Sequence, residues 1–481
     1  MYLGLDLGTS GVKALLIDAA QTVVAEGQAP LVVSRPQSGW SEQDPDSWIT
    51  ACEAAIDAVR RAAPQAFAAL KGIAVSGQMH GATLLDAQDQ PLRPAILWND
   101  GRSVEECRTL EARADFRGIG GNIVMAGFTA PKLEWVRTHE PEVFAKTKKV
   151  LLPKDYVGLW LTGRHMSEMS DAAGTLWLDV ARRDWSDALL EATGLTRAHM
   201  PELVEGSAQA GMLRKELASV WGVGAVIVAG GAGDNAATAC GLGITQAGDA
   251  FVSLGTSGVL FTTTDRFAAN TEAAVHSFCH AVPDTWHQMG VILSAADGLN
   301  WLSEVVGQSP QALAALVPEK PEAPSPVTFL PYLSGERTPH NAPQASAGFL
   351  GLKREQGLPQ LAQSVLEGVA FALADCRDAI EGSGAELKTA WVAGGGSHSK
   401  AWLNIIAAST GLTLKVPQSG AQGAALGAAR LAMAACGESD VFTTPELMAE
   451  ITPDPLLSAA YAERIKGFRK AFHALKEVGM G

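Results

Sequence analysis

Gly4-Leu5-Asp6-Leu7-Gly8-Thr9-Ser10-Gly11-Val12-Lys13 is the stretch from which the rest of the chain can be interpreted. Apolar residues lie on both sides of a tip of small residues, which predicts a β-hairpin. Glycines let a backbone approach a ligand closely, and backbone N–H groups beside the hydroxyls of Thr9 and Ser10 can surround a phosphate. Aspartate is uncommon in strands, so Asp6 indicates a functional role.

The same turn occurs a second time. Residues 7–12 recur identically as Leu254-Gly255-Thr256-Ser257-Gly258-Val259, again between two β-like runs. The alternative is that two glycine-rich hairpins match by coincidence. We instead predict an internal duplication, with an α/β fold, an N-terminal domain of residues 1–245 and a C-terminal domain of residues 246–481. Ser253 replaces Asp6 in the second copy, so only the first half keeps a carboxylate there.

Composition narrows the class of protein. The 481 residues are 47% hydrophobic, enough for a core in each half, and the net charge of −14 argues against nucleic acid as a partner. The six cysteines are widely spaced without a C-x-x-C pair, which favours reduced, buried thiols. The chain starts directly with a predicted strand and has no long uncharged apolar run. We therefore expect a cytoplasmic protein without a signal peptide or membrane span.

Polar and aromatic residues directly follow two short predicted strands. They are Gln78-Met79-His80 and Trp98-Asn99-Asp100. Ligands of open α/β sheets bind beyond the carboxyl ends of strands, so both loops are candidate substrate loops. Their hydrogen-bonding groups suit the hydroxyls of a sugar, and an indole ring suits its apolar face. The alternatives are a structural role for His80 and a core position for Trp98.

Gly230-Gly231-Ala232-Gly233-Asp234-Asn235 follows a buried predicted strand. A loose dinucleotide-binding fingerprint is disfavoured, because no βαβ unit follows. Asp234 could be an N-cap at the start of a helix. It could equally be a catalytic carboxylate on a rigid glycine turn at the junction of the halves. The residues alone leave these two interpretations open.

A third glycine-rich loop, Gly394-Gly395-Gly396-Ser397, lies between a predicted strand and a predicted helix. This arrangement is typical of an anion or nucleotide site. A merely flexible turn is the alternative, although three glycines carry an entropic cost. The chain has no G-x-x-x-x-G-K-[ST] motif, so a Walker-type site is excluded. Two phosphate-binding hairpins, one from each half, would instead enclose a triphosphate in a cleft between the domains.

Together these motifs resemble those of the FGGY carbohydrate kinases, in the superfamily of actin, sugar kinases and chaperone ATPases. The resemblance covers essentially the whole chain. It implies two ribonuclease-H-like domains around a cleft, and the Gln-Met-His-Gly loop indicates xylulose as the sugar within the family. The segments that carry it are Asp6–Gly11, Gly77–Gly81, Trp98–Asp100, Gly233–Asn235 and Ser253–Ser257, with two family signatures at Gly127–His139 and Ala347–Glu367.

The resemblance also implies a reaction and its residues. The reaction is ATP-dependent phosphorylation of D-xylulose at the C5 hydroxyl, with Asp234 as general base and Mg²⁺ near Asp6, held through water. The implied sugar contacts are Met79, His80, Trp98, Asp100 and Asn235. The implied nucleotide contacts are Thr9, Ser10, Lys13, Gly255, Thr256, Gly395 and Gly396, with a simple surface lysine as the alternative for Lys13.

Two further alternatives concern the whole protein. One is an FGGY kinase for ribulose, glycerol or another polyol. The other is a non-catalytic ATPase switch with the same fold, which the retention of both Asp6 and Asp234 disfavours. Partners are expected to be a small sugar and MgATP, with neither nucleic acid nor membrane. Members of the family often form homodimers.

Overall fold

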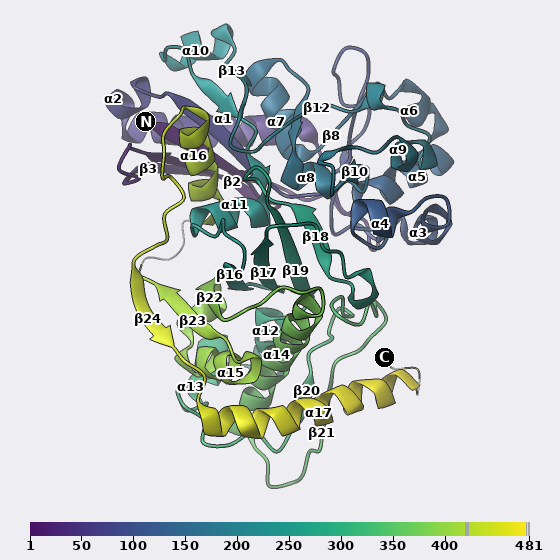
Figure 1. Ribbon diagram of the computed structural model, residues 1–481, viewed down its shortest axis with the longest axis vertical. Coiled ribbons are helices and arrows are strands. Elements are labelled where there is room, and N and C mark those ends of the chain that lie inside the picture. The colour runs from purple at the N-terminus through teal and green to yellow at the C-terminus, as the bar shows by residue number, and fades with distance from the viewer. Residues whose placement is uncertain (419–422, 478, 480–481) are drawn as a thin grey trace.

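The computed structural model describes residues 1–418, 423–477 and 479. Two domains are stacked along the long axis of the molecule, and each is built on a mixed sheet flanked by helices (Figure 1). The predicted α/β fold with two duplicated domains is confirmed. All six cysteines are free thiols; four are buried, whereas Cys107 and Cys436 are half-buried. No helix in the described part of the chain is both long enough and apolar enough to span a bilayer.

The first domain contains a seven-stranded sheet with the order β13-β14-β5-β1-β2-β3, and β15 also pairs with β5. Its strands are β1 (Tyr2–Leu7), β2 (Gly11–Ile17), β3 (Val23–Pro30), β5 (Gly72–Gly77), β13 (Gln209–Met212), β14 (Ile227–Ala229) and β15 (Ala232–Gly233).

The second domain contains another seven-stranded sheet, with the order β18-β19-β17-β16-β22-β23-β24. Its strands are β16 (Ala250–Leu254), β17 (Gly258–Thr264), β18 (His276–Cys279), β19 (Trp286–Ile292), β22 (Thr389–Ala393), β23 (Thr413–Pro417) and β24 (Leu447–Ile451).

The two sheets share one pairing pattern. The hairpin β1–β2 corresponds to β16–β17, and both are antiparallel. Parallel strands follow in both domains: β5 and β14 beside β1, and β22 and β23 beside β16. An antiparallel strand ends each series, β13 in the first domain and β24 in the second. This equivalence extends the six-residue repeat to whole domains.

In the part of the chain that the structure describes, five two-stranded sheets and a set of helices complete the fold. The small sheets are β4 (Glu42–Gln43) with β7 (Ala95–Ile96), β6 (Thr83–Leu85) with β8 (Lys149–Leu151), β9 (Met166–Glu168) with β12 (Glu202–Val204), β10 (Leu178–Asp179) with β11 (Asp184–Trp185), and β20 (Thr328–Leu330) with β21 (Gly348–Leu350). The helices of the first half are α1 (Pro45–Ala62), α2 (Pro64–Ala68), α3 (Val104–Glu111), α4 (Phe116–Gly120), α5 (Thr129–His139), α6 (Pro141–Lys146), α7 (Pro153–Thr162), α8 (Met169–Ala173), α9 (Asp187–Ala192), α10 (Lys215–Trp221) and α11 (Asp234–Gly241). Those of the second half are α12 (Ala296–Val306), α13 (Pro310–Ala315), α14 (Leu358–Glu381), α15 (Lys400–Thr410), α16 (Gly423–Ala435) and α17 (Pro455–Glu477), and 3₁₀ turns cover Arg197–His199, Thr271–Ala273 and Gly395–His398.

Helix α16 comes from the second half of the chain but packs against the first sheet. It contacts β1, β5 and α11 and lies in the upper domain (Figure 1). The approach is close: a Cβ at Gly4 would lie 1.9 Å from the carbonyl oxygen of Ala425, and one at Gly427 would lie 1.7 Å from that of Ala237. Only glycine fits at these two crossings. The boundary between residues 245 and 246 stays a prediction.

The two domains also share a hydrophobic cluster. Phe251, Phe261 and Phe278 of the second sheet belong to the same buried cluster as Phe116 and Trp177 of the first domain. Each sheet has its own core besides this cluster. The shared cluster therefore joins the domains and fixes the relative positions of the loops that meet between them.

Candidate active site

The first hairpin brings the tip of β1–β2 beside the loop that follows β5. Gly8 N donates to Gly11 O at 3.0 Å and closes the tip. Glycine is required at position 11, because a Cβ there would lie 2.7 Å from the carbonyl oxygen of Ala29. Strands β1 and β5 are parallel, with Asp6 opposite Ser76, and Gln78 N donates to Leu7 O at 2.9 Å.

Asp6 lies half-buried at the end of β1. Burial and the nearby charge of Asp234 raise the pKa of Asp6 from 3.8 to about 7, against the opposing influence of Ser76 and Lys13. Lys13 faces Asp6 across the hairpin and forms an ion pair with Glu26 at 3.2 Å. The two carboxylates singled out from the sequence therefore lie close enough to interact electrostatically.

Asp234 begins α11 directly after the short strand β15, which is parallel to β5. The N-cap of this helix is Gly233, so the interpretation of Asp234 as an N-cap is wrong. The Oδ1 atom of Asp234 accepts from Asn235 N at 2.7 Å and from Asn235 Nδ2 at 2.9 Å. Burial raises the pKa of Asp234 to about 6, although the hydrogen bonds from Asn235 oppose the shift.

Glycine makes this turn possible. Gly231 has a φ of +78°, and a Cβ there would lie 2.0 Å from the carbonyl oxygen of Val75. A Cβ at Gly233 would lie 3.0 Å from Cγ of Met79. The turn therefore fits tightly against β5, and the side chain of Met79 lies directly beside the residue before Asp234.

His80 occupies a half-buried position with a φ of +70°. Its Nδ1 lies 2.7 Å from the carbonyl oxygen of Gly174, and its own carbonyl oxygen accepts from Lys132 Nζ at 2.8 Å. Burial and the charge of Lys132 lower the pKa of His80 to about 3. A carbonyl can only accept, so Nδ1 carries the proton of the neutral ring and Nε2 is an acceptor.

The loop after β7 carries two of the predicted sugar contacts, Trp98 and Asp100, and their surroundings differ. The ring of Trp98 is 42% exposed, and its Nε1 donates to Thr9 Oγ1 at 3.0 Å. Asp100 is buried, pairs with Arg102 at 2.7 Å and accepts from Ser41 N at 2.6 Å. The carboxylate of Asp100 therefore fastens this loop to a neighbouring segment, an arrangement that does not favour its predicted contact with a sugar.

The second hairpin borders a cavity of about 930 Å³ in the second domain. Gly255, Thr256, Gly395 and Gly396 all line it. The carbonyl oxygen of Gly255 accepts from the N–H of Ala296, the first residue of α12, at 2.9 Å. That of Thr256 accepts at 2.8 Å from the N–H of Ala295, the N-cap of α12, so both bonds fix the hairpin to that helix.

The glycine loop after β22 lies against the same hairpin. A Cβ at Gly394, where φ is +84°, would lie 2.7 Å from the carbonyl oxygen of Leu254, and one at Gly396 would lie 2.8 Å from both Leu254 Cβ and the ring of Trp402. Two of the predicted nucleotide-binding segments therefore form one surface. Thr9, Ser10 and Lys13 belong to the first hairpin and lie outside this cavity.

Family models match both halves of the chain. The N-terminal domain of the FGGY family of carbohydrate kinases matches residues 1–241, and its C-terminal domain matches residues 250–436. The chain belongs to the FGGY family of carbohydrate kinases. It is therefore a phosphotransferase, as the motifs predict.

Several relatives of this FGGY kinase match it over nearly their whole length. It is 50% identical over 481 residues to the xylulose kinase of Escherichia coli (strain K12), with 99% of each chain covered. A crystal structure described as a xyloylose kinase from Brucella ovis is 55% identical, with a TM-score of 0.97 and 99% of both chains covered. The xylulose kinase structure from Rhodospirillum rubrum is 28% identical, with a TM-score of 0.92 and 99% of both chains covered.

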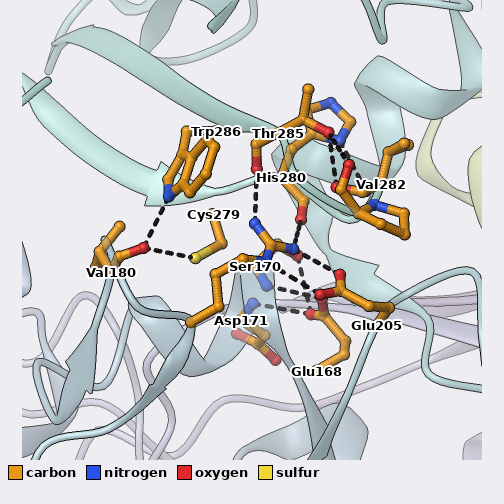
Figure 2. Close-up of polar contacts among 12 residues, drawn as sticks. Glu168, Ser170, Asp171, Val180, Glu205, Cys279, His280, Val282, Thr285 and Trp286 are labelled. Carbon is orange, nitrogen blue, oxygen red and sulfur yellow. Dashed lines mark hydrogen bonds and ion pairs between the residues drawn. The ribbon is translucent and has the colours of Figure 1, made fainter. Parts of the chain in front are cut away.

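The structure of the FGGY kinase also shows supporting residues that the sequence analysis missed. Residues 170–175 look turn-like in the sequence, but Met169–Ala173 form the short helix α8. Ser170 Oγ accepts from Gly233 N at 3.0 Å and donates to Glu168 Oε1 at 2.9 Å. Figure 2 shows Ser170 and Asp171 beside Glu168. Glu168 and Ser170 support the turn that carries Asp234, but no local sequence pattern around them predicts this role.

A buried ion cluster lies beside α8. Lys154 Nζ is 2.7 Å from Asp155 and 3.6 Å from Glu168. Burial raises the pKa of Asp171 well above its ordinary range, and the charges of Asp155, Glu168 and Asp234 add to this shift against the opposing charge of Lys154. The Asp234 carboxylate is therefore one member of an acidic region with a buried lysine in it.

Hairpin β18–β19 fixes the second domain to the first at this point (Figure 2). Trp286 Nε1 donates to the carbonyl oxygen of Val180 at 2.7 Å. Arg183 pairs with Glu205 and donates to the carbonyl oxygen of Thr285 at 2.7 Å. No local pattern predicts this contact, because its partners come from distant segments.

Proposed function

We propose that this FGGY kinase transfers the γ-phosphoryl group of MgATP to the C5 hydroxyl of D-xylulose, with Asp234 as general base. The observation that carries the proposal is the position of Asp234, which is half-buried directly after Gly233, the residue that packs against the Met79 side chain, and whose pKa is raised to about 6. The Escherichia coli and Rhodospirillum rubrum relatives are named xylulose kinases, which supports this sugar.

The chemistry of Asp234 suits a general base. Such a group works best when its pKa lies near the operating pH, because it is then ionised and still accepts a proton. A pKa of about 6 leaves Asp234 mostly ionised at neutral pH and more basic than an ordinary aspartate. Both hydrogen bonds from Asn235 fall on Oδ1 and orient the carboxylate, so Oδ2 is directed to the sugar hydroxyl.

The sugar would lie between the two polar loops. The Nε2 atom of His80 accepts a hydrogen bond from a sugar hydroxyl, since Nδ1 is occupied by Gly174. The exposed ring of Trp98 covers the apolar face of the sugar, and Met79 and Asn235 complete the contact. Asp100 acts as a positioning residue for the Trp98 loop through its ion pair with Arg102.

The nucleotide would occupy the 930 Å³ cavity, with its phosphates directed towards the first hairpin. Magnesium ions in kinases are held by one or two carboxylates together with phosphates and water. No cluster of three or more ligating side chains occurs among residues 1–418 and 423–477, so a single Asp6 beside the phosphates, acting through water, fits this pattern. When bound, Mg²⁺ neutralises charge on the transferred phosphoryl group.

The test is ADP release by the purified enzyme with MgATP and D-xylulose, D-ribulose, L-ribulose or glycerol, followed by NMR of the product. We expect the highest kcat/KM with D-xylulose and a phosphate on C5. Preference for another polyol would overturn the assigned sugar but keep the kinase reaction. ADP release that does not depend on any sugar would overturn the whole proposal in favour of an ATPase switch.

A further inference from the structure

A chain of hydrogen-bonded polar side chains, buried at its centre, joins the first hairpin to both proposed sugar loops. It consists of Thr9, Gln43, Trp48, Gln78 and Trp98. Gln43, Trp48 and Gln78 are 1%, 0% and 3% exposed, respectively. Buried amides without hydrogen-bond partners are costly, so each amide atom in such a chain must find a partner.

The hydrogen bonds define one orientation for both amides. Trp48 Nε1 and Gln78 Nε2 approach the same atom of Gln43, at 3.0 and 2.9 Å, so this atom is the acceptor Oε1. The Nε2 atom of Gln43 then donates to the carbonyl oxygen of Thr9 at 2.7 Å. The remaining amide atom of Gln78 is Oε1, which accepts from Thr9 Oγ1 at 2.9 Å.

Thr9 is therefore held at two atoms. Its hydroxyl proton is donated to Gln78, the same oxygen accepts from Trp98 Nε1, and its carbonyl oxygen accepts from Gln43. Because the hydroxyl donates to Gln78, it cannot also donate to a phosphate. The nucleotide contact implied for Thr9 would then come from the backbone of the tip.

This hydrogen-bonded chain reaches the proposed sites of both ligands. Gln78 directly precedes Met79 and His80, and Trp98 presents an exposed ring on the other sugar loop. Thr9 lies at the tip that follows Asp6. We propose that Thr9 and Gln78 are positioning residues that connect the sugar loops to the phosphate-binding tip, so that sugar and nucleotide bind cooperatively. The inference rests on the proposed function of these loops.

The duplicated hairpin supplies a matched control. Thr256 has the same neighbours in sequence as Thr9, but its side chain is exposed and lines the nucleotide cavity. Its carbonyl oxygen binds α12, a segment without a proposed sugar contact. Removal of the Thr256 hydroxyl should therefore weaken nucleotide binding equally with and without sugar. Removal of the Thr9 hydroxyl should change the ratio of the nucleotide affinity with sugar to the nucleotide affinity without sugar.

The experiment is isothermal titration of the full-length protein with Mg²⁺ and AMP-PNP, with and without saturating sugar. The sugar is whichever one the wild type phosphorylates fastest. The proteins compared are the wild type, Thr9→Val, Thr9→Ser and Thr256→Val, each with its thermal unfolding midpoint. Should Thr9→Val fail to fold, Gln78→Met replaces it, because that change removes both the acceptor for Thr9 and the donor to Gln43, and it should lower the ratio in the same way.

We expect the sugar to tighten AMP-PNP binding to the wild type about 5- to 150-fold. The ratio of AMP-PNP affinities with and without sugar should fall to within about twofold of one in Thr9→Val. It should return to the wild-type value in Thr9→Ser and keep that value in Thr256→Val. A wild-type ratio of one, or a wild-type ratio in Thr9→Val, would overturn the inference. Phosphorylation of a sugar other than D-xylulose would overturn the proposed substrate alone, because the ratio is still measured with the sugar that reacts.

Discussion

The two hairpins Leu7–Val12 and Leu254–Val259 have identical sequences and different surroundings. The tip of the first is fastened by side chains to the loops that hold Gln78 and Trp98. The tip of the second is fastened through its backbone to the start of α12, and its threonine faces a large cavity. The comparison shows that two copies of one motif can serve different ligands when different residues pack around them.

The residue before each tip completes the contrast. Asp6 is the penultimate residue of β1, and burial and the neighbouring charge of Asp234 raise its pKa to about 7. Ser253 holds the equivalent place before the second hairpin and brings no charge. A carboxylate beside a phosphate is unfavourable unless a cation lies between them, so only one of the two hairpins is suited to lie next to a magnesium ion.

Among exchanges between the two hairpins, the largest expected effect comes from making the first hairpin like the second. Asp6→Ser removes the carboxylate that distinguishes them, and we expect kcat to fall on the order of 10²–10³, because charge on the transferred group is no longer balanced as well. Steady-state ADP release at saturating substrates measures this. A kcat within about threefold of the wild type would show that the two hairpins are equivalent in catalysis.

A second test concerns stability. The pKa of Asp6 is about 7 in the folded protein and near its ordinary value of 3.8 when unfolded, so the folded state binds more protons between these values. The raised pKa of Asp6 therefore contributes to the free energy of unfolding below about pH 4, and this contribution is lost as the pH rises through 7. We expect Asp6→Asn to stabilise the protein by on the order of 2 kcal/mol at pH 8 and by little at pH 4.

Urea unfolding at both pH values, followed by tryptophan fluorescence, measures this difference. Ser253→Asn serves as the matched control, because no carboxylate is removed there. Equal stabilisation of Asp6→Asn at pH 4 and pH 8 would contradict a raised pKa for Asp6.

The reverse exchange tests the second hairpin. Ser253→Asp places a carboxylate before the tip that we assign to the nucleotide, and repulsion should raise the KM for ATP roughly tenfold. The KM for the sugar should change much less, because the sugar loops pack on the other hairpin. Initial rates with each substrate varied in turn separate the two constants. Equal changes in both would count against the division of labour between the hairpins.

The smallest expected effect is at Gly395, where a Cβ would meet nothing within 4 Å although the residue lines the nucleotide cavity. Gly395→Val should raise the KM for ATP several-fold, on the order of 1 kcal/mol of binding energy, without lowering the thermal midpoint. Gly396→Ala is the contrasting variant, because its Cβ would collide with Leu254 and Trp402 and should lower the midpoint. An unchanged KM in Gly395→Val would place the nucleotide elsewhere.

Much of the fold could be predicted because its signals are local. The repeated tip, the alternation of strands with glycine turns and the strand before Gly230 are all contiguous in the sequence. The position of Asp234 at a strand end could be predicted for the same reason. Its N-cap interpretation was wrong because the helix begins one residue earlier than a cap would require.

The parts that could not be predicted depend on distant segments. Gln43 and Gln78 meet only after the sheet has formed, and nothing near Gln43 in the sequence signals its partner. Asp100 is predicted to contact the sugar, and only the structure shows that Arg102 and Ser41 bind its carboxylate. The packing of α16 on the first sheet likewise depends on close backbone approach at Gly4, which no periodicity predicts.

The most direct measurement of the central claim is the pH dependence of kcat/KM for D-xylulose in the wild type and in Asp234→Asn. The variant keeps an oxygen that can accept from Asn235, so both hydrogen bonds and the fold should persist. We expect the wild-type value to fall tenfold per pH unit below about 6, where Asp234 becomes protonated. We expect the variant to be slower on the order of 10²–10⁴ and to lack this acid limb. A variant with near wild-type turnover, or with the same acid limb, would contradict Asp234 as the base.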